Sequence, residues 1–326
     1  MTKPATHEPM PVLRTLENRI ARVSDSRRSE FLEAFRELEQ FSNRYVREMS
    51  EKGLFPAAYP WPLDPLHNWT RWWEYTFAWL HIRDILKTRT PVHILDIGSA
   101  LTFFPVFLAH QGAHVYALDV DARMGVWSTT AVRRLECLAP DALKRFEPVN
   151  ADCRSTALPD ESIDVVTNIS VLEHLDDQDR AIAELHRVLK PRGVFVSTLD
   201  LSLDGLPFGD SLPLPVAETE AFIENLRSRF QTTVEGAFTH PLDVLTFSNR
   251  PRALTRTVAD TPSARNGVAA RWVLTLWHRW LRQAVKVAQS RILVRPIAKV
   301  PIRALRFAFD SKRLDMLTVL GVVVHK

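Results

Sequence analysis

The stretch from residue 93 to residue 121, HILDIGSALTFFPVFLAHQGAHVYALDVD, constrains the fold of this chain more than any other. It reads as an apolar strand, a turn at Gly98, a helical pattern over 103–111 and a second apolar strand that ends at Asp119. Such a βαβ unit belongs to a doubly wound sheet, which binds its ligand at the carboxyl ends of the strands. An acidic residue about 20 positions after the glycine turn is placed to accept both hydroxyls of a ribose. The sequence therefore predicts a site for an adenosine-containing cofactor.

The glycine turn argues against a dinucleotide as this cofactor. A dinucleotide site needs further glycines so that the pyrophosphate can approach a helix N-terminus. Here the turn reads GSALTF, so only the first glycine of the GxGxxG pattern is present and Phe103 stands where the third would be. Asp96 also lies inside the first strand, where dinucleotide folds keep apolar residues. The turn alone suits many βα units, so the choice of cofactor depends on the segments that follow.

Two later segments extend the pattern, NADCRSTALPDESIDVVTNISVLEHL at 150–175 and AIAELHRVLKPRGVFVST at 181–198. Together with LDIGSA and ALDVD, they resemble class I S-adenosylmethionine-dependent methyltransferases of the group that methylates small molecules and lipids. The resemblance covers roughly residues 90–200 in order and spacing, with an ending at 316–325. It implies a Rossmann-like α/β fold with a doubly wound, seven-stranded sheet. It also implies S-adenosylmethionine as cofactor and S-adenosylhomocysteine as product.

The resemblance assigns the turn to the methionine part of the cofactor, with Asp96 and Gly98 shaping the loop beneath it. The sequence departs from the family at Ala100 and Thr102, where most members have glycines. Ala100 adds a methyl group where backbone and cofactor run close, so this departure leaves the cofactor affinity open. A chain without that affinity would be a non-catalytic cofactor-binding or partner-binding protein, which we keep as an alternative.

The other strand ends are assigned to the rest of the cofactor by the same resemblance. It implies that Asp119 holds the ribose hydroxyls and that Asp152 accepts from the adenine amino group, with the backbone of Cys153 against the ring. Asn168 would offer its carbonyl to the cofactor's ammonium. The alternative for Asp119 and Asp152 is that they are ordinary loop carboxylates. Cys153 is not expected to be a nucleophile, because no base is placed near it in the sequence.

The segment before the first strand, HNWTRWWEYTFAWLHIRDIL at 67–86, predicts a helix rich in aromatic residues. In related enzymes this segment folds over the cofactor. Arg71 would then meet the cofactor's carboxylate, and Tyr75 would close over the sulfonium because aromatic faces attract cations. The alternative is that the aromatic side chains are core, since aromatic stripes usually indicate packing.

Methyl transfer from a sulfonium is an in-line displacement in which the protein mainly orients the acceptor and excludes water. A general base is needed only where the acceptor arrives protonated. The candidates near the strand ends are His174, His240, and Glu74 or Tyr75 of the predicted lid helix. His174 matches a position that is frequent in the family, where its role is often structural. No residues have the spacing of zinc ligands, so we expect no metal.

We divide the chain into four parts: an N-terminal helical cap or lid at 1–89, a cofactor-binding core at 90–238, a helical basic insertion at 239–314 and a final strand at 315–326. In the first part, 13–50 predicts a helix broken near 24–29. In the core we expect strands at 92–97, 114–119, 145–150, 163–168, 193–199 and 231–237. Pro191 to Gly193 should end a helix and start a strand. The final strand should be antiparallel, which places the insertion above the site as a substrate cap.

Charge is distributed unevenly along the chain. Residues 252–306 hold twelve Lys/Arg and one acidic residue, a net +11, which leaves −7 for the rest of a chain whose net charge is +4. Within this segment, 268–290 is amphipathic, with tryptophans on the apolar face and basic residues opposite. The pattern fits a cap helix with a solvated face, or a helix that lies on an anionic membrane surface. Nucleic acid is a weaker partner, because no RNA-binding module is recognised.

The predicted function is methyl transfer to a small-molecule acceptor at oxygen, nitrogen or carbon, with a peripheral membrane enzyme acting on a lipid as an alternative. Two cysteines, Cys137 and Cys153, give no disulfide framework. The first residues lack the apolar core of a signal peptide, and no apolar run reaches the roughly 18 residues of a membrane span. We therefore expect a cytoplasmic protein, with peripheral membrane attachment as the alternative. The sequence leaves the oligomeric state open.

Overall fold

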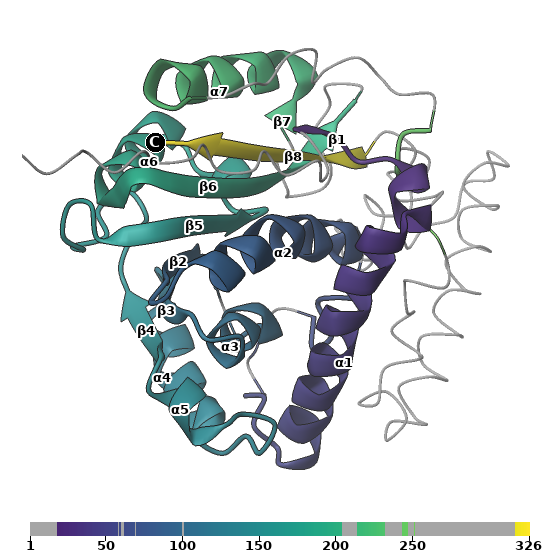
Figure 1. Cartoon of the computed structure of the whole chain (residues 1–326), viewed down its shortest axis with the longest axis vertical. Helices are drawn as coiled ribbons and strands as arrows, with labels where there is room; N and C mark the ends of the chain where they lie inside the picture. Colours follow the sequence, from purple (N-terminus) through teal and green to yellow (C-terminus); the bar gives the residue numbers. More distant parts are fainter. Residues whose placement is uncertain are drawn as a thin grey trace, which may run out of the picture.

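One mixed sheet with helices on both faces organises the chain in this computed structural model (Figure 1). The structure describes residues 18–57, 59, 62–68, 70–99, 101–203, 214–231, 243–246, 251 and 317–326. The predicted insertion at 239–314 therefore falls almost wholly outside the described residues, as do His240 and Ala100. The α/β, doubly wound fold class predicted from the sequence is confirmed.

The strands lie in the order β1-β8-β6-β5-β2-β3-β4, and a short β7 pairs with β6 outside this path. Their bounds are β1 Arg19–Ile20, β2 His93–Ile97, β3 His114–Asp119, β4 Phe146–Asn150, β5 Ile163–Ile169, β6 Leu189–Ser202, β7 Leu214–Pro215 and β8 Leu317–His325. Strands β2 to β6 are parallel, so their carboxyl ends meet at one edge of the sheet. The sheet therefore has the edge of strand carboxyl ends at which the sequence predicts the cofactor site, and this edge is called the cofactor edge below.

The last strand, β8, is antiparallel to β6, as predicted. Its first residue, Leu317, pairs with Ser202 at the carboxyl end of β6, so β8 starts at the predicted cofactor edge. The strand expected at 231–237 is described only at Gln231, which bridges to His325 in β8. Leu317, the first described residue of this end of the chain, therefore lies on the side where the insertion was expected.

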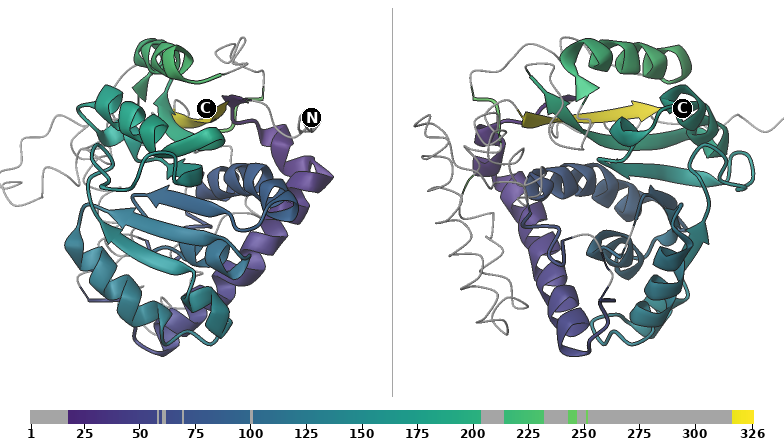
Figure 2. Two further views of the ribbon diagram at one scale, coloured as in Figure 1. Left: turned by 60° about the vertical axis from the view of Figure 1, so that its left-hand side comes forward. Right: turned by 180° about the vertical axis from the view of Figure 1, so that it is seen from behind.

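Helices cover the two faces of the sheet unequally (Figures 1 and 2). The first face carries α1 Ser29–Glu51, α2 Arg71–Thr88, α3 Phe103–His110, α4 Ala122–Val132 and α5 Pro140–Leu143. The second face carries α6 Gln178–Val188 and α7 Val216–Arg229. Two short 3-10 turns, η1 Val23–Arg27 and η2 Leu172–His174, connect elements. The apolar side chains of each strand alternate between the two resulting cores, as the period of a strand requires.

The N-terminal helix was predicted in part correctly. Its apolar stripe, which includes Phe31, Leu38 and Tyr45, is buried as the three- and four-residue spacing indicates. The prediction that the helix begins near residue 13 is wrong at residues 19–20, which form β1 against β8. An exposed strand edge offers unpaired backbone groups, and β1 satisfies those of β8 while burying Ile20 in the second core.

Helix α2 lies between α1 and the sheet and is buried on almost every side (Figure 1). Trp72 and Trp73 are fully buried, which supports the core interpretation for these two tryptophans. Trp73 stacks on Phe77 with ring centroids 4.9 Å apart. The two rings lie directly over Gly321 of β8, where an added Cβ would come within 2.7 Å of the Phe77 ring and 2.8 Å of the Trp73 ring. Helix α2 therefore sits close to the sheet because β8 has no side chain at this point.

We expect Gly321→Ala to lower the free energy of unfolding by about 1–3 kcal/mol, because the new methyl group must push apart two fully buried rings. Chemical unfolding followed by far-UV circular dichroism measures the loss. Gly125→Ala in α4 is the matched control, since its Cβ would meet Pro148 at an ordinary 3.7 Å. Equal stability of the two variants would show that α2 can shift away from β8 without cost.

The segment from Pro191 to Gly193 lies inside β6 and does not separate a helix from a strand, so that prediction is wrong in detail. Helix α6 ends at Val188, and β6 begins at Leu189. The pairing with β5 shifts between Ile163 and Val165, which marks a bulge. The bulge accommodates a proline, which cannot donate a hydrogen bond to the neighbouring strand.

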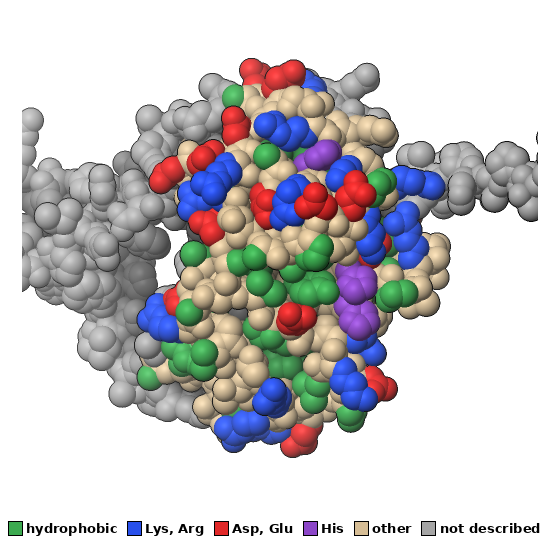
Figure 3. All heavy atoms as spheres, turned by 90° about the vertical axis from the view of Figure 1, so that its left-hand side faces the viewer, with side chains coloured by type: hydrophobic (Ala, Val, Ile, Leu, Met, Phe, Trp, Pro, Cys, Tyr) green, Lys and Arg blue, Asp and Glu red, His purple; other side chains and the backbone are tan. Residues whose placement is uncertain are grey.

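The face at the amino ends of the parallel strands carries charges of both signs (Figure 3). Lys, Arg, Asp and Glu side chains are interspersed over its described part, and histidines gather there. His93 and His114, the first residues of β2 and β3, stack with ring centroids 5.1 Å apart. Within the described ranges, each helix is too short or too polar to cross a membrane.

Candidate functional site

The turn after β2 is fixed by a buried carboxylate. Asp96 accepts hydrogen bonds from Thr167 Oγ1 on β5 at 2.5 Å and from Ser99 Oγ at 2.7 Å. Gly98 has φ +62°, and a Cβ at this position would lie 2.5 Å from Val171 Cγ2. The turn therefore requires glycine both for its backbone angle and for its approach to the loop after β5. Asp96 therefore joins the turn to the neighbouring strand, and its role beneath the cofactor stays a prediction.

Burial raises the pKa of Asp96 to about 6, and the nearby charge of Asp119 raises it further, while the hydrogen bonds from Thr167 and Ser99 favour the ionised form. In the unfolded chain the same carboxyl ionises near its ordinary value of 3.8. Between these two values the folded state binds more protons than the unfolded state. The contribution of Asp96 to stability therefore falls as the pH rises from about 4 to 6.

We expect Asp96→Asn to remove this part of the pH dependence. The stability of the variant relative to the wild type should rise by about 3 kcal/mol between pH 4 and pH 7, at 1.36 kcal/mol for each pKa unit. Urea unfolding at intervals of one pH unit measures the difference, which isolates Asp96 from the other carboxyl groups. Parallel pH profiles for the variant and the wild type would contradict the raised pKa.

Two predicted cofactor carboxylates follow β3 and β4. Asp119, half-buried, ends β3, and its Oδ1 accepts the backbone N–H of Asp121 at 2.9 Å. Asp152 is held by Arg154, with 2.6 Å between Nη2 and Oδ2 and 3.0 Å between Nε and Oδ1. This ion pair lowers the pKa of Asp152. Burial raises the pKa of the Cys153 thiol to about 11, which agrees with the expectation that Cys153 is no nucleophile.

Asn168 lies on β5 with its side chain completely buried. Its Nδ2 donates to Ser197 Oγ at 2.7 Å and to the Thr198 carbonyl at 3.1 Å. Its Oδ1 accepts the backbone N–H groups of Val171 and Leu172 at 3.2 and 3.1 Å. The side chain therefore fixes the loop that follows β5. The contact of its main-chain carbonyl with a cofactor ammonium stays a prediction.

Arg71 begins α2 and points at the carboxyl ends of β5 and β6. Its guanidinium contacts Glu74, donates to Ser170 Oγ at 2.6 Å and lies 3.5 Å from Asp200 Oδ2. Glu74, fully buried, accepts from the hydroxyls of Ser170 at 2.6 Å and Thr198 at 2.8 Å. Arg71 is thus surrounded by groups of this chain, and its predicted contact with the cofactor carboxylate remains untested.

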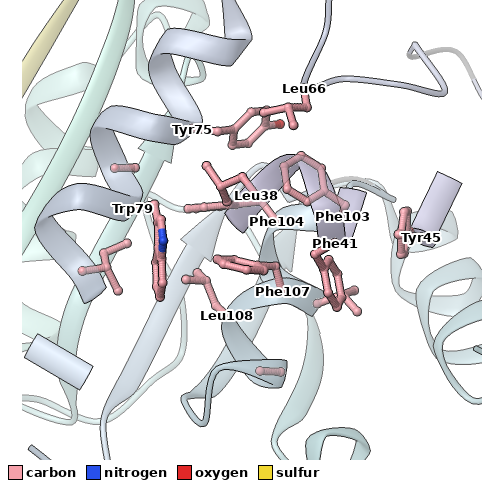
Figure 4. Packing of buried hydrophobic residues seen from close by; sticks show 14 of the residues in the cluster. Leu38, Phe41, Tyr45, Leu66, Tyr75, Trp79, Phe103, Phe104, Phe107 and Leu108 are labelled. Carbon is pink, nitrogen blue, oxygen red and sulfur yellow. The ribbon is translucent and has the colours of Figure 1, made fainter. Parts of the chain in front are cut away.

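Tyr75 packs in the first core over the start of α3, with ring centroids 5.0 Å from Phe103 and 5.1 Å from Phe104 (Figure 4). Desolvation raises its pKa, which works against proton abstraction at neutral pH. Its ring is nevertheless close enough to Asp96 to feel that charge. The structure therefore places Tyr75 beside the turn where the sulfonium was predicted.

His174 ends η2 with an exposed side chain. Partial burial and the charge of Arg71 lower its pKa, so the imidazole is neutral at pH 7 and can accept a proton. His174 thus fits the predicted base in charge state and place, and the role itself stays a prediction.

Sequence reasoning missed three groups near this edge: Tyr59, Glu173 and Asp200. Burial raises the pKa of the Tyr59 hydroxyl, a hydrogen bond with the backbone of Leu101 lowers it, and the charge of Asp119 raises it further. Glu173 and Asp200 each keep one buried carboxylate oxygen without a hydrogen-bond partner among the described residues. In the sequence, Tyr59 is marked only by its place in a proline-rich bend, and Glu173 only by its place next to His174. Neither feature has a spacing that identifies a binding or catalytic residue.

These residues fit an adenosine-containing cofactor. Carboxylates follow β3 and β4, where a ribose diol and an adenine amino group would donate hydrogen bonds. The turn at Gly98 brings its backbone close to the loop after β5, and the Tyr59 hydroxyl lies near enough to Asp119 to feel its charge. Within the described ranges, no group of three His, Cys, Asp or Glu side chains could hold a metal ion.

Comparison with known families and proteins gives matches over the same region. A family model described as a methyltransferase domain matches residues 95–197. The ubiquinone biosynthesis O-methyltransferase of Pseudomonas aeruginosa strain UCBPP-PA14 is 28% identical over 141 residues, which cover 40% of this chain and 58% of that protein. The protein of the same name from Thiobacillus denitrificans is 30% identical over 141 residues with the same coverage. The match therefore spans 58% of the length of these relatives.

Solved structures with a similar fold include two that align with most of this chain. The 4+2 cyclase SpnF has a TM-score of 0.46 at 20% identity, covering 76% of this chain and 80% of that one. A putative sarcosine dimethylglycine methyltransferase from Galdieria sulphuraria has a TM-score of 0.46 at 15% identity, covering 76% and 86%.

Proposed function

We propose that this chain, whose residues 95–197 match a methyltransferase-domain family model, is a class I S-adenosylmethionine-dependent methyltransferase that transfers a methyl group from that cofactor to a small-molecule acceptor. The observation that carries the proposal is the extent of the family match. It begins inside β2, continues through the ends of β3, β4 and β5, and stops in β6, so it contains the ends of β2 to β5, where the predicted cofactor residues lie. An oxygen acceptor is the first to test, because the matched relatives are named as O-methyltransferases.

The residues of this chain would hold the cofactor along the edge formed by β2 to β5. Asp119 would accept hydrogen bonds from both ribose hydroxyls, and Asp152 would accept one from the adenine amino group. The turn at Gly98 would lie beneath the methionine part of the cofactor. When bound, S-adenosylmethionine supplies an electrophilic methyl group on a sulfonium. The protein's part is to orient the acceptor in line with that group, to exclude water and to take up any proton the acceptor releases.

Attachment to a membrane surface is a second proposal, carried by the net +11 of residues 252–306. A basic amphipathic segment binds anionic lipid by charge, and salt weakens such binding. Co-sedimentation with vesicles of phosphatidylserine and phosphatidylcholine should show binding that falls with ionic strength. Equal binding to vesicles of phosphatidylcholine alone would reject the electrostatic attachment.

Calorimetric titration of the purified protein with S-adenosylmethionine, S-adenosylhomocysteine and NAD tests the cofactor. Micromolar binding of the two adenosyl ligands, with none of NAD, would support the proposal and justify an acceptor screen with labelled methyl groups. No binding to a folded sample would favour the non-catalytic alternative motivated by Ala100 and Thr102.

A further inference from the structure

Two buried carboxyl groups lie together where the parallel strands end. Glu173 belongs to η2, and Asp200 lies near the carboxyl end of β6, beyond the last residue of β5 in register. Their exposed fractions are 4% and 7%. The backbone N–H of Asp200 donates to Glu173 Oε1 at 2.8 Å. Among the described residues, Glu173 Oε2 and Asp200 Oδ1 are each buried without a hydrogen-bond partner.

Such an arrangement is costly unless something satisfies these oxygens. A buried acceptor without a partner costs about 1–3 kcal/mol, and more when it is charged. Two ionised carboxylates cannot satisfy each other, because both are acceptors only. The two unpartnered oxygens can be stabilised in two ways. A carboxylate can take up a proton and become a carboxylic acid, or a bound ligand can donate a hydrogen bond to it.

The charges around the pair are unbalanced. Asp200 Oδ2 lies 3.5 Å from Arg71, and Arg71 also contacts the buried Glu74. Three buried carboxyl groups thus share one guanidinium among the described residues, while His174 beside them is neutral at pH 7. Desolvation and the charge of Asp200 raise the pKa of Glu173 well above its ordinary value, and burial raises that of Asp200 to about 6.

We propose that Glu173 stays protonated and that the carboxylate of Asp200 binds, and then deprotonates, a methyl acceptor that presents a hydroxyl or amine hydrogen-bond donor. This inference rests on the proposed function and names the chemistry of its acceptor. Asp200 is the member of the pair that a ligand can reach, because its side chain keeps 10% of its surface exposed at the carboxyl edge of β6.

The proton balance of the step is simple. A bond forms between the acceptor oxygen or nitrogen and the methyl carbon, while the bond from that carbon to sulfur breaks. The electron pair of the broken bond stays on sulfur, which changes from a sulfonium to a thioether. The acceptor's proton passes to Asp200 and later to water. A base whose pKa lies near the working pH suits this task.

The pair also selects against one class of ligand. Unpartnered carboxylate oxygens attract donors and repel anions, so a carboxylate or phosphate group should not bind at this point of the site. Arg71 does not offset this, since Glu74 and Asp200 already neutralise its charge.

Infrared spectroscopy tests the proton without any substrate. At pH 7.5 the wild type should show the carbonyl stretch of a buried protonated carboxyl group, which Glu173→Gln removes. Acidification should add further such bands with an apparent pKa near 6, because Asp96 and Asp200 both titrate there, and Asp200→Asn should remove the part that remains in Asp96→Asn. Asp164→Asn is the matched control: Asp164 is also buried, but it is partnered by the N–H of His93 at 2.9 Å and by Lys190 at 2.8 Å. Absence of the first band in the wild type would overturn the protonated pair.

The acceptor is tested with catechol, phenol and ethanolamine as probes, each titrated into the protein saturated with S-adenosylhomocysteine. At least one should bind the wild type and the Asp164→Asn variant equally, and Asp200→Asn should weaken it at least 10-fold. Equal binding to Asp200→Asn, or binding of none of the three to the wild type, would reject the acceptor class. Failure of S-adenosylhomocysteine itself to bind would reject the proposed function, whereas the infrared result does not depend on the cofactor.

Any probe that is methylated gives a further readout that a merely structural role would not change. In the wild type kcat/KM should rise as the pH passes about 6, because Asp200 ionises there. In Asp200→Asn this step in the pH profile should disappear along with most of the activity. A step that persists in the variant would assign the base to another group, with His174 the first to examine.

Discussion

Replacing Asp119 with alanine should weaken the binding of S-adenosylmethionine by at least about 100-fold. The carboxylate ends β3 at the edge where β2 and β5 also end, and in the proposed site it accepts two hydroxyl donors of one ribose. Hydrogen bonds to a charged group contribute about 1.5–3 kcal/mol each, so the loss of two amounts to at least about 3 kcal/mol. Calorimetric titration with S-adenosylmethionine and S-adenosylhomocysteine measures the change.

The matched control for this variant is Asp141→Ala in α5. Asp141 is an exposed carboxylate that pairs with Lys144 on the surface, and its loss should change neither the affinity nor the fold. Asp119→Asn should fall between the alanine variant and the wild type, because it keeps one acceptor oxygen. Near-normal affinity in Asp119→Ala, with circular dichroism unchanged, would mean that the cofactor lies elsewhere.

The fold was largely predictable because its core elements carry local signals. The strands β2, β3 and β5 are apolar runs, and each is bounded by a turn or followed by a helical pattern. What the sequence could not indicate was pairing at a distance. The two residues of β1 have no strand pattern of their own, and they are extended only because β8, some 300 positions away, offers a free edge.

The candidate site likewise contains residues that local sequence patterns predict and residues that only the packing of distant segments brings together. Asp119 and Asp152 follow apolar strands, so the topology alone places them at one edge. Glu173 and Asp200 meet through a hydrogen bond across 27 positions of sequence, and Glu74 meets Thr198 across 124. Spacing in the sequence carries no information about such contacts. The network around Arg71 was therefore not predictable from the sequence, because it depends on the packing of α2 against the ends of β5 and β6.

Replacing Glu74 with alanine should lower the free energy of unfolding by about 3–5 kcal/mol. Its carboxylate is fully buried and accepts from Arg71 and from the hydroxyls of Thr70, Ser170 and Thr198. Without Glu74 the Arg71 guanidinium keeps only the longer contact with Asp200 at 3.5 Å, and the three buried hydroxyls lose their acceptor, and breaking such a buried network is strongly destabilising. Chemical unfolding of the variant and the wild type at pH 7 measures the loss.

Two further variants decide whether the loss comes from the uncompensated charge or from the cavity. In a double-mutant cycle, Arg71→Ala should cost less in the Glu74→Ala background than in the wild type, because Arg71 has then already lost its contact with Glu74. Glu33→Ala, an exposed glutamate of α1, should change stability by less than about 0.5 kcal/mol. Additive losses at residues 71 and 74 would mean that the two side chains contribute separately, and the network at the end of β6 would then not act as one electrostatic unit.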